Sequence, residues 1–216
     1  VKYLGDMISV DGQHKLNIKE RENKGVGAVC QVMSMLKELS LGYYYFNIGL
    51  LLRDTNVINS ILYNSEIWNG LTLEQVKLLE NVVLMYFRKL FEAHSKTAIE
   101  AFYIESGKMP IKMIIKVRRL MYWWHLNNVK QTSLIQQCYK ALKSSPVRKD
   151  WVHTLENDKR EFNINLDDDD IKTISKYKFK KLVKSSAMNK TVQYLSNLKK
   201  TRMYGSESAT GLPNNF

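Results

Sequence analysis

The chain has 216 residues, 44% of them hydrophobic, which is enough to build a folded core, and no apolar stretch approaches the roughly 18 residues of a membrane-spanning helix. We therefore expect no membrane partner. Its two cysteines, Cys30 and Cys138, form neither a disulfide framework nor a C-x-x-C pair, which is typical of a reducing, intracellular compartment. The net charge of +12 favours a polyanionic partner.

The opening residues, VKYLGDMISVDG, carry neither an initiator Met nor a targeting signal, so we expect the sequence to begin inside a longer protein. Loose alternation of side chains, with Gly5 and Asp11-Gly12 as bend signals, predicts strand material that ends in a turn. A hairpin this short is not stable by itself, so we expect its pairing partners to lie upstream.

Helical spacing dominates the rest of the chain, and we predict an all-α, bundle-like domain preceded by a short β-strand remnant. Two S/T-x-x-E/Q capping boxes, Thr72-Leu73-Glu74-Gln75 and Thr97-Ala98-Ile99-Glu100, open two of the helices. Gly25 and Gly27 weaken the first helix by about 1 kcal/mol each. The predicted helices lie around residues 26–36, 46–63, 73–90, 98–107, 110–128, 133–142, 148–161, 170–187 and 190–200.

Composition divides the chain into four parts. The sequence Ser144-Ser145-Pro146 is the best internal boundary, and the last dozen residues are rich in Gly, Ser, Asn and Pro. We therefore distinguish residues 1–12, a helical domain 13–145, a basic helical region 146–204 and a disordered tail 205–216.

The predicted helix after Pro110 separates into two faces on a helical wheel. Lys112, Lys116, Arg119 and Trp123 fall in one narrow sector, and the opposite sector is apolar. Two interpretations remain open. The polar sector is either an ordinary solvated face, or a nucleic-acid-binding face in which the cations contact phosphates and the indole stacks on a base.

Residues 171–204 carry ten basic residues and no Asp or Glu. Within them, Lys172, Lys176, Lys180 and Lys184 form an i, i+4 row on a single predicted helix, opposite Ile171, Ile174 and Leu182. Like charges at this spacing repel one another, so helix stability alone does not select the row. We favour a polyanion-binding face over a merely solvated one.

The acidic run Asp167 to Asp170 has the oxygen ligands that Mg²⁺ prefers, but adjacent residues at a helix start point in different directions. We favour helix capping for this run, because Asp satisfies free N–H groups at a helix N-terminus. The four histidines are dispersed, and no phosphate loop, nucleophile elbow or zinc-binding helix motif is present. We predict no metal site, no cofactor and no catalytic residue in this chain.

Several short strings occur in an order that resembles a known family. Lys2-Tyr3-Leu4-Gly5 is followed by Asp11-Gly12, and later by Ile61-Leu62-Tyr63-Asn64-Ser65-Glu66-Ile67-Trp68 and by residues 90–119. This order resembles the region just after the polymerase palm in reverse transcriptases of non-LTR retrotransposons, over roughly residues 1–130. Asn64 stands where many relatives have Gly.

The resemblance implies that residues 1–12 end the palm at the primer grip, with Tyr3, Leu4 and Gly5 near the primer. It also implies that residues 13–145 form the thumb and linker, which hold an RNA or RNA/DNA template-primer duplex beside the upstream palm, in the nucleus. The family's aromatic-x-Asp-Asp metal site is missing from this sequence. We therefore expect a fragment of an RNA-directed DNA polymerase that is inactive on its own, with Mg²⁺ bound in the parent protein.

Simpler roles stay open for the same residues. Trp68 is more readily explained as buried core than as a functional contact, and Tyr3 and Leu4 as packing residues. The alternative function is a non-enzymatic helical module that binds another protein, in which the positive charge serves solubility.

Overall fold

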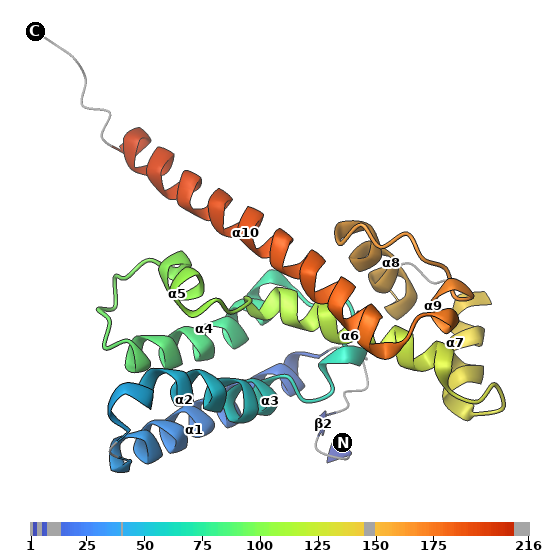
Figure 1. The fold of residues 1–216 in the computed structure, drawn as a ribbon, viewed down its shortest axis with the longest axis horizontal. Helices are drawn as coiled ribbons and strands as arrows, with labels where there is room; N and C mark the ends of the chain where they lie inside the picture. The colour runs from blue at the N-terminus through green and yellow to red at the C-terminus, as the bar shows by residue number, and fades with distance from the viewer. Residues whose placement is uncertain (1, 4–5, 8–13, 40, 145–149, 210–216) are drawn as a thin grey trace, which may run out of the picture.

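The computed structural model describes residues 2–3, 6–7, 14–39, 41–144 and 150–209 (Figure 1). The all-α prediction is confirmed: outside a pair of two-residue strands, β1 (Lys2–Tyr3) and β2 (Asp6–Met7), the regular elements are helices. The two strands pair antiparallel with each other. The α-helices are α1 (Lys15–Glu38), α2 (Tyr45–Leu52), α3 (Ile58–Ile61), α4 (Leu73–Leu90), α5 (Ile99–Ser106), α6 (Ile111–Asn128), α7 (Leu134–Ser144), α8 (Trp151–Glu161), α9 (Asp170–Thr173) and α10 (Lys176–Ala209).

Helix α4 shows how the local sequence determines an element. The Thr72 hydroxyl accepts the Gln75 backbone N–H at 3.2 Å, and the Gln75 side chain accepts the Thr72 N–H at 2.9 Å, so the predicted capping box is present. The second predicted box is not: α5 begins after Ala98 and has no side-chain cap. Gly107 ends α5 in the left-handed conformation, with φ of 62°.

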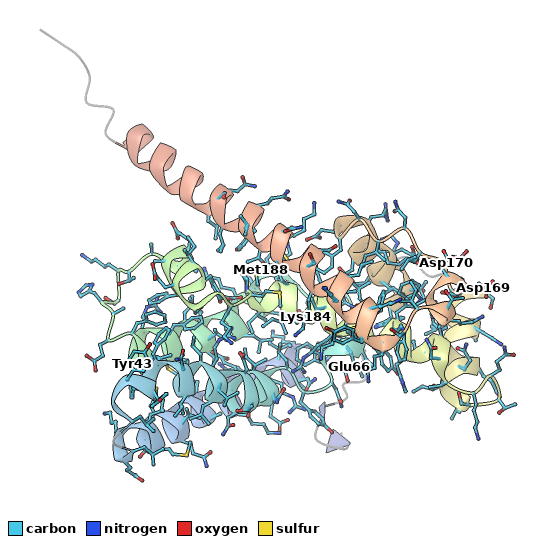
Figure 2. The ribbon with its side chains drawn as sticks, viewed as in Figure 1. Tyr43, Glu66, Asp169, Asp170, Lys184 and Met188 are labelled. Carbon is cyan, nitrogen blue, oxygen red and sulfur yellow. The ribbon has the colours of Figure 1, made fainter. Side chains whose placement is uncertain are left out.

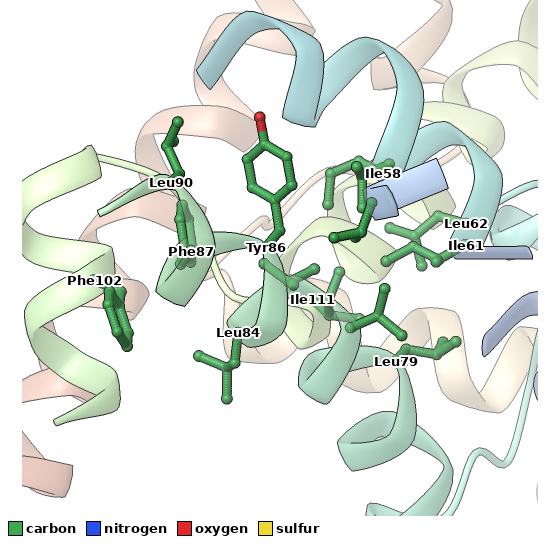
Figure 3. Close-up of a cluster of buried hydrophobic side chains, with 14 of the residues drawn as sticks. Ile58, Ile61, Leu62, Leu79, Leu84, Tyr86, Phe87, Leu90, Phe102 and Ile111 are labelled. Atoms are coloured by element: carbon green, nitrogen blue, oxygen red, sulfur yellow. The ribbon is translucent and has the colours of Figure 1, made fainter. Parts of the chain in front are cut away.

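The first core lies between α1, α3, α4 and α5 (Figure 3). Leu79, Phe87 and Leu90 of α4 are buried in it. Gly25 allows α1 to approach closely, because a Cβ at this position would lie 2.2 Å from the Ile61 Cγ2 atom. The glycine that weakens α1 as an isolated helix is therefore required by its packing.

Helices α2 and α3 occupy the region that was predicted as a single helix, residues 46–63. A π-helical turn at Arg53–Val57 lies between them. The Arg53 side chain is buried, pairs with Asp54 at 2.6 Å and lies over the Phe87 ring. Downstream, Asn64 adopts the left-handed conformation, with φ of 56°, which glycine adopts readily and Asn tolerates. This turn therefore does not need the Gly that many members of the resembled family have.

Helix α6 belongs to two cores. Ile111, Ile114 and Ile115 pack in the first, whereas other apolar side chains of α6, among them Leu120 and Trp123, pack with α7 to α10 in the second. Phe179 of α10 packs edge-on to Trp123 in that second core. The expected boundary at residues 145 and 146 therefore does not coincide with a break in the packing of the described residues.

Helix α10 differs from its prediction at both ends. The helical path breaks at Ile174 and Ser175, where the Ser175 hydroxyl accepts the Lys178 N–H at 3.4 Å. The helix then continues to Ala209, through the expected gap before residue 190 and past the expected start of a disordered tail at 205. Residues 210–216 lie outside the described part of the chain.

Candidate nucleic-acid interface

The polar side of α6 is not the open face that the helical wheel suggested. Arg119 is only 4% exposed and Trp123 is fully buried, while Lys116 is largely covered by α8. Of the four residues predicted there, Lys112 alone remains exposed. The prediction of an exposed face at Lys116, Arg119 and Trp123 is therefore wrong, because α6 is a central helix that is covered on both sides.

Ion pairs with α8 explain how these cations are accommodated. Arg119 donates to the Asp158 carboxylate and to the Trp68 carbonyl oxygen, and Lys116 pairs with Glu161 and lies 3.6 Å from Asp158. Burial raises the pKa of Asp158, and the cations Arg119 and Lys116 oppose that effect. Arg119 of α6 thus connects α8 with the backbone at Trp68. The Trp68 side chain is buried, which confirms the prediction that it is a core residue.

The Trp123 indole is fixed by a polar network. Its Nε1–H donates to Asp168 at 2.9 Å, the Tyr139 hydroxyl donates to the same carboxylate at 3.0 Å, and Lys143 pairs with it at 2.7 Å. Burial alone would raise the pKa of Asp168, but these donors outweigh it and hold the pKa below its ordinary range. The network satisfies the buried indole N–H, so stacking of Trp123 on a base has no support.

The capping interpretation of the acidic run is confirmed at Asp167. Its carboxylate accepts the backbone N–H groups of Asp169 and Asp170 at 2.8 and 2.7 Å, at the start of α9. These bonds hold the pKa of Asp167 below its ordinary value. Within the described ranges, no group of three or more His, Cys, Asp or Glu residues is placed to hold a metal ion.

The predicted lysine row divides at the break before α10. Lys172 lies on α9 and pairs with Asp169 at 2.7 Å, and the Lys176 ammonium lies 5.9 Å from the centre of the Trp124 ring. Lys180 and Lys184 are exposed on α10, and Figure 2 labels Lys184 with the neighbouring Met188. The prediction that all four lysines share one helix is therefore wrong, although Lys176, Lys180 and Lys184 are exposed residues of α10.

Two further exposed lysines of α10, Lys178 and Lys181, were not part of the predicted row. The lysine face of α10 consists of exposed lysines that form no ion pair and no ring contact with any residue whose side chain is described: Lys178, Lys180, Lys181 and Lys184. Leu182, which the prediction placed on the apolar side, is 41% exposed, whereas Phe179 and Val183 are buried. Ser175 carried the missed signal, because an N-cap residue there starts a new helix and shifts its faces.

The resemblance predicts three primer-proximal residues, Tyr3, Leu4 and Gly5. Tyr3 ends β1, whereas Leu4 and Gly5 lie outside the described residues.

No described helix has the length and apolarity required to cross a membrane. Comparison of the chain with protein-family models, with curated proteins and with solved structures found no match.

Proposed function

We propose that this chain binds nucleic acid, through phosphate contacts of the lysine face of α10. The observation that carries the proposal is four exposed lysines on consecutive turns of one helix without ion partners in the described part of the chain. From Lys176 to Leu198 the helix has six lysines and no acidic residue. Such a uniform field attracts polyanions and contributes nothing to helix stability.

The kind of nucleic acid follows from the resemblance to reverse transcriptases of non-LTR retrotransposons. On that basis the proposed ligand is RNA or an RNA/DNA duplex, and the chain is the thumb and linker part of an RNA-directed DNA polymerase. The helical architecture of residues 15–144 is compatible with such a role. The palm of the parent protein would supply the carboxylates and the Mg²⁺.

Binding should be measured by fluorescence anisotropy with a labelled RNA/DNA duplex over a series of salt concentrations. Changing all four lysines of the face to Gln preserves helix propensity and removes up to four phosphate contacts. We expect weaker binding for every duplex sequence, with the slope of log K against log salt reduced by about 3 to 4 units.

A matched control removes the same charge elsewhere. Lys37, Lys96, Lys130 and Lys140 are exposed lysines outside α10, and their quadruple Gln variant has the same net charge as the first. We expect this control to retain most of the salt slope. Equal losses in both variants would show a general charge effect and would count against the lysine face.

A second candidate function, docking on another protein, is favoured by exposed aromatic residues between α1 and α2. Tyr43 is 89% exposed and Tyr44 is 64% exposed, beside a hollow of about 620 Å³ that Leu36 and Leu41 help to line. Exposed aromatic surface of this kind is typical of interaction sites. If the parent chain melts cooperatively, and is therefore folded, but shows no detectable duplex binding at low salt, this candidate is favoured.

A further inference from the structure

Two adjoining cavities run along the seam between α4 and α6. One, of about 360 Å³, extends toward α8, and the other, of about 330 Å³, extends toward α5 and α10. Leu73, Val76 and Lys112 line both of them. Each volume lies in the range of small-molecule sites, about 300–1,000 Å³.

The cavity beside α5 contains polar groups that the described residues leave unsatisfied. Tyr103 is 2% exposed, and its hydroxyl has no hydrogen-bond partner among them. Glu80 accepts the Ile111 backbone N–H at 2.9 Å with one carboxylate oxygen, and its other oxygen has no such partner. An unsatisfied buried polar group costs about 1–3 kcal/mol, so a ligand that offers a donor to the Glu80 oxygen or an acceptor to the Tyr103 hydroxyl gains that energy.

The remaining walls suit a flat ring with an anionic substituent. Leu84, Ile99 and Pro110 provide apolar surface, and Tyr194 of α10 provides an aromatic ring. Lys77 and Lys112 line the same cavity, are exposed, and form no ion pair with a residue whose side chain is described. The cavity thus combines an apolar floor, two unsatisfied oxygens and two available cations.

We propose that this cavity binds one purine nucleotide unit, with its base against Tyr103 and Tyr194 and its phosphate between Lys77 and Lys112. The exocyclic amino group of the base donates to the free Glu80 oxygen, and a ring nitrogen accepts from the Tyr103 hydroxyl. Both oxygens are shielded from water, so a side-chain rotation must accompany binding. The unit is either a free nucleotide or the 5′ end of a single strand, because both present the same base and phosphate.

The test is calorimetric titration of the full chain with AMP, with adenosine, with ribose 5-phosphate and with a 5′-phosphorylated oligoadenylate. AMP should bind with one-to-one stoichiometry and more tightly than either of its halves. Tyr103→Phe removes only the hydroxyl and should weaken AMP binding about fivefold. The Lys77→Gln, Lys112→Gln double variant should weaken it about tenfold.

The Lys130→Gln, Lys140→Gln double variant is the matched control, because these exposed lysines do not line the cavity, and it should leave AMP binding unchanged. Equal melting temperatures for Tyr103→Phe and the parent chain establish that the fold is retained. Tighter binding of AMP than of the oligoadenylate assigns the site to a free nucleotide, and the reverse order assigns it to a strand end.

Three results would each overturn the proposal: no heat with millimolar AMP, binding of ribose 5-phosphate as tight as that of AMP, or unaltered AMP affinity in Tyr103→Phe. The site is independent of the proposed function. Loss of AMP binding in the quadruple Gln variant of the lysine face would also contradict it, since those lysines do not line the cavity. Failure of duplex binding would leave the AMP result standing.

Discussion

Replacing Arg119 with Met should destabilise the protein severely. The substitution keeps an unbranched side chain of similar length but removes the guanidinium that binds Asp158 and the Trp68 carbonyl. It leaves a buried carboxylate with only the 3.6 Å contact to Lys116, and a buried carbonyl without its donor. Breaking one side of such a pair costs about 3–5 kcal/mol.

Urea denaturation followed by circular dichroism measures this cost as the change in the free energy of unfolding. In a thermal melt we expect the transition to fall by about 10 °C, because 1 kcal/mol corresponds to roughly 2–4 °C in a chain of this size. Combining Arg119→Met with Asp158→Leu removes both charges. The double variant should recover part of the loss, although the Trp68 carbonyl still lacks a donor.

The pH dependence gives a second, independent check. Burial already raises the pKa of Asp158, and loss of Arg119 removes the main influence that lowers it. A carboxyl whose pKa is higher in the folded state than in the unfolded state binds more protons when folded, so the variant gains relative stability as pH falls. The destabilisation should be smaller at pH 5 than at pH 8. A cost below about 1 kcal/mol, or one that grows as pH falls, would refute the reasoning.

Three other predictions concern separate parts of the chain. Gly25→Ala should destabilise by about 1–3 kcal/mol in urea denaturation, since the new Cβ would lie 2.2 Å from Ile61, whereas Gly27→Ala, with open space around it, should stabilise α1 slightly. Burial raises the pKa of Glu80 to about 7, above its ordinary value of 4.5, so the folded chain binds more protons than the unfolded chain between these values. The parent chain should therefore lose stability relative to Glu80→Gln as pH rises from about 5 to 8. A difference in the free energy of unfolding that does not change with pH would contradict this. Finally, the purified chain should not extend a primer in Mg²⁺, because its sequence lacks the paired metal-binding carboxylates of a polymerase, and metal-dependent primer extension would show this prediction to be wrong.

The sequence by itself determined the elements whose signals are local. Helix α4 begins at its capping box, and α6 follows Pro110 as predicted, because caps and prolines act within one turn of the chain. The capping role of Asp167 and the burial of Trp68 also followed from residue type and position. The helical spacing of apolar residues was sufficient for the all-α class.

Only the tertiary structure decided which faces are covered. A helical wheel separates Lys116 and Arg119 from the apolar residues, but it does not show that α8 supplies Asp158 and Glu161 as their partners. A central helix surrounded on both sides buries its cations with partners that are about 40 residues away in the sequence, and no local pattern reports those partners. No local pattern shows that Gly25 is needed, because the reason is the close approach of Ile61 of α3. Nor does one show the cavity, because its walls come from four helices, α4, α5, α6 and α10.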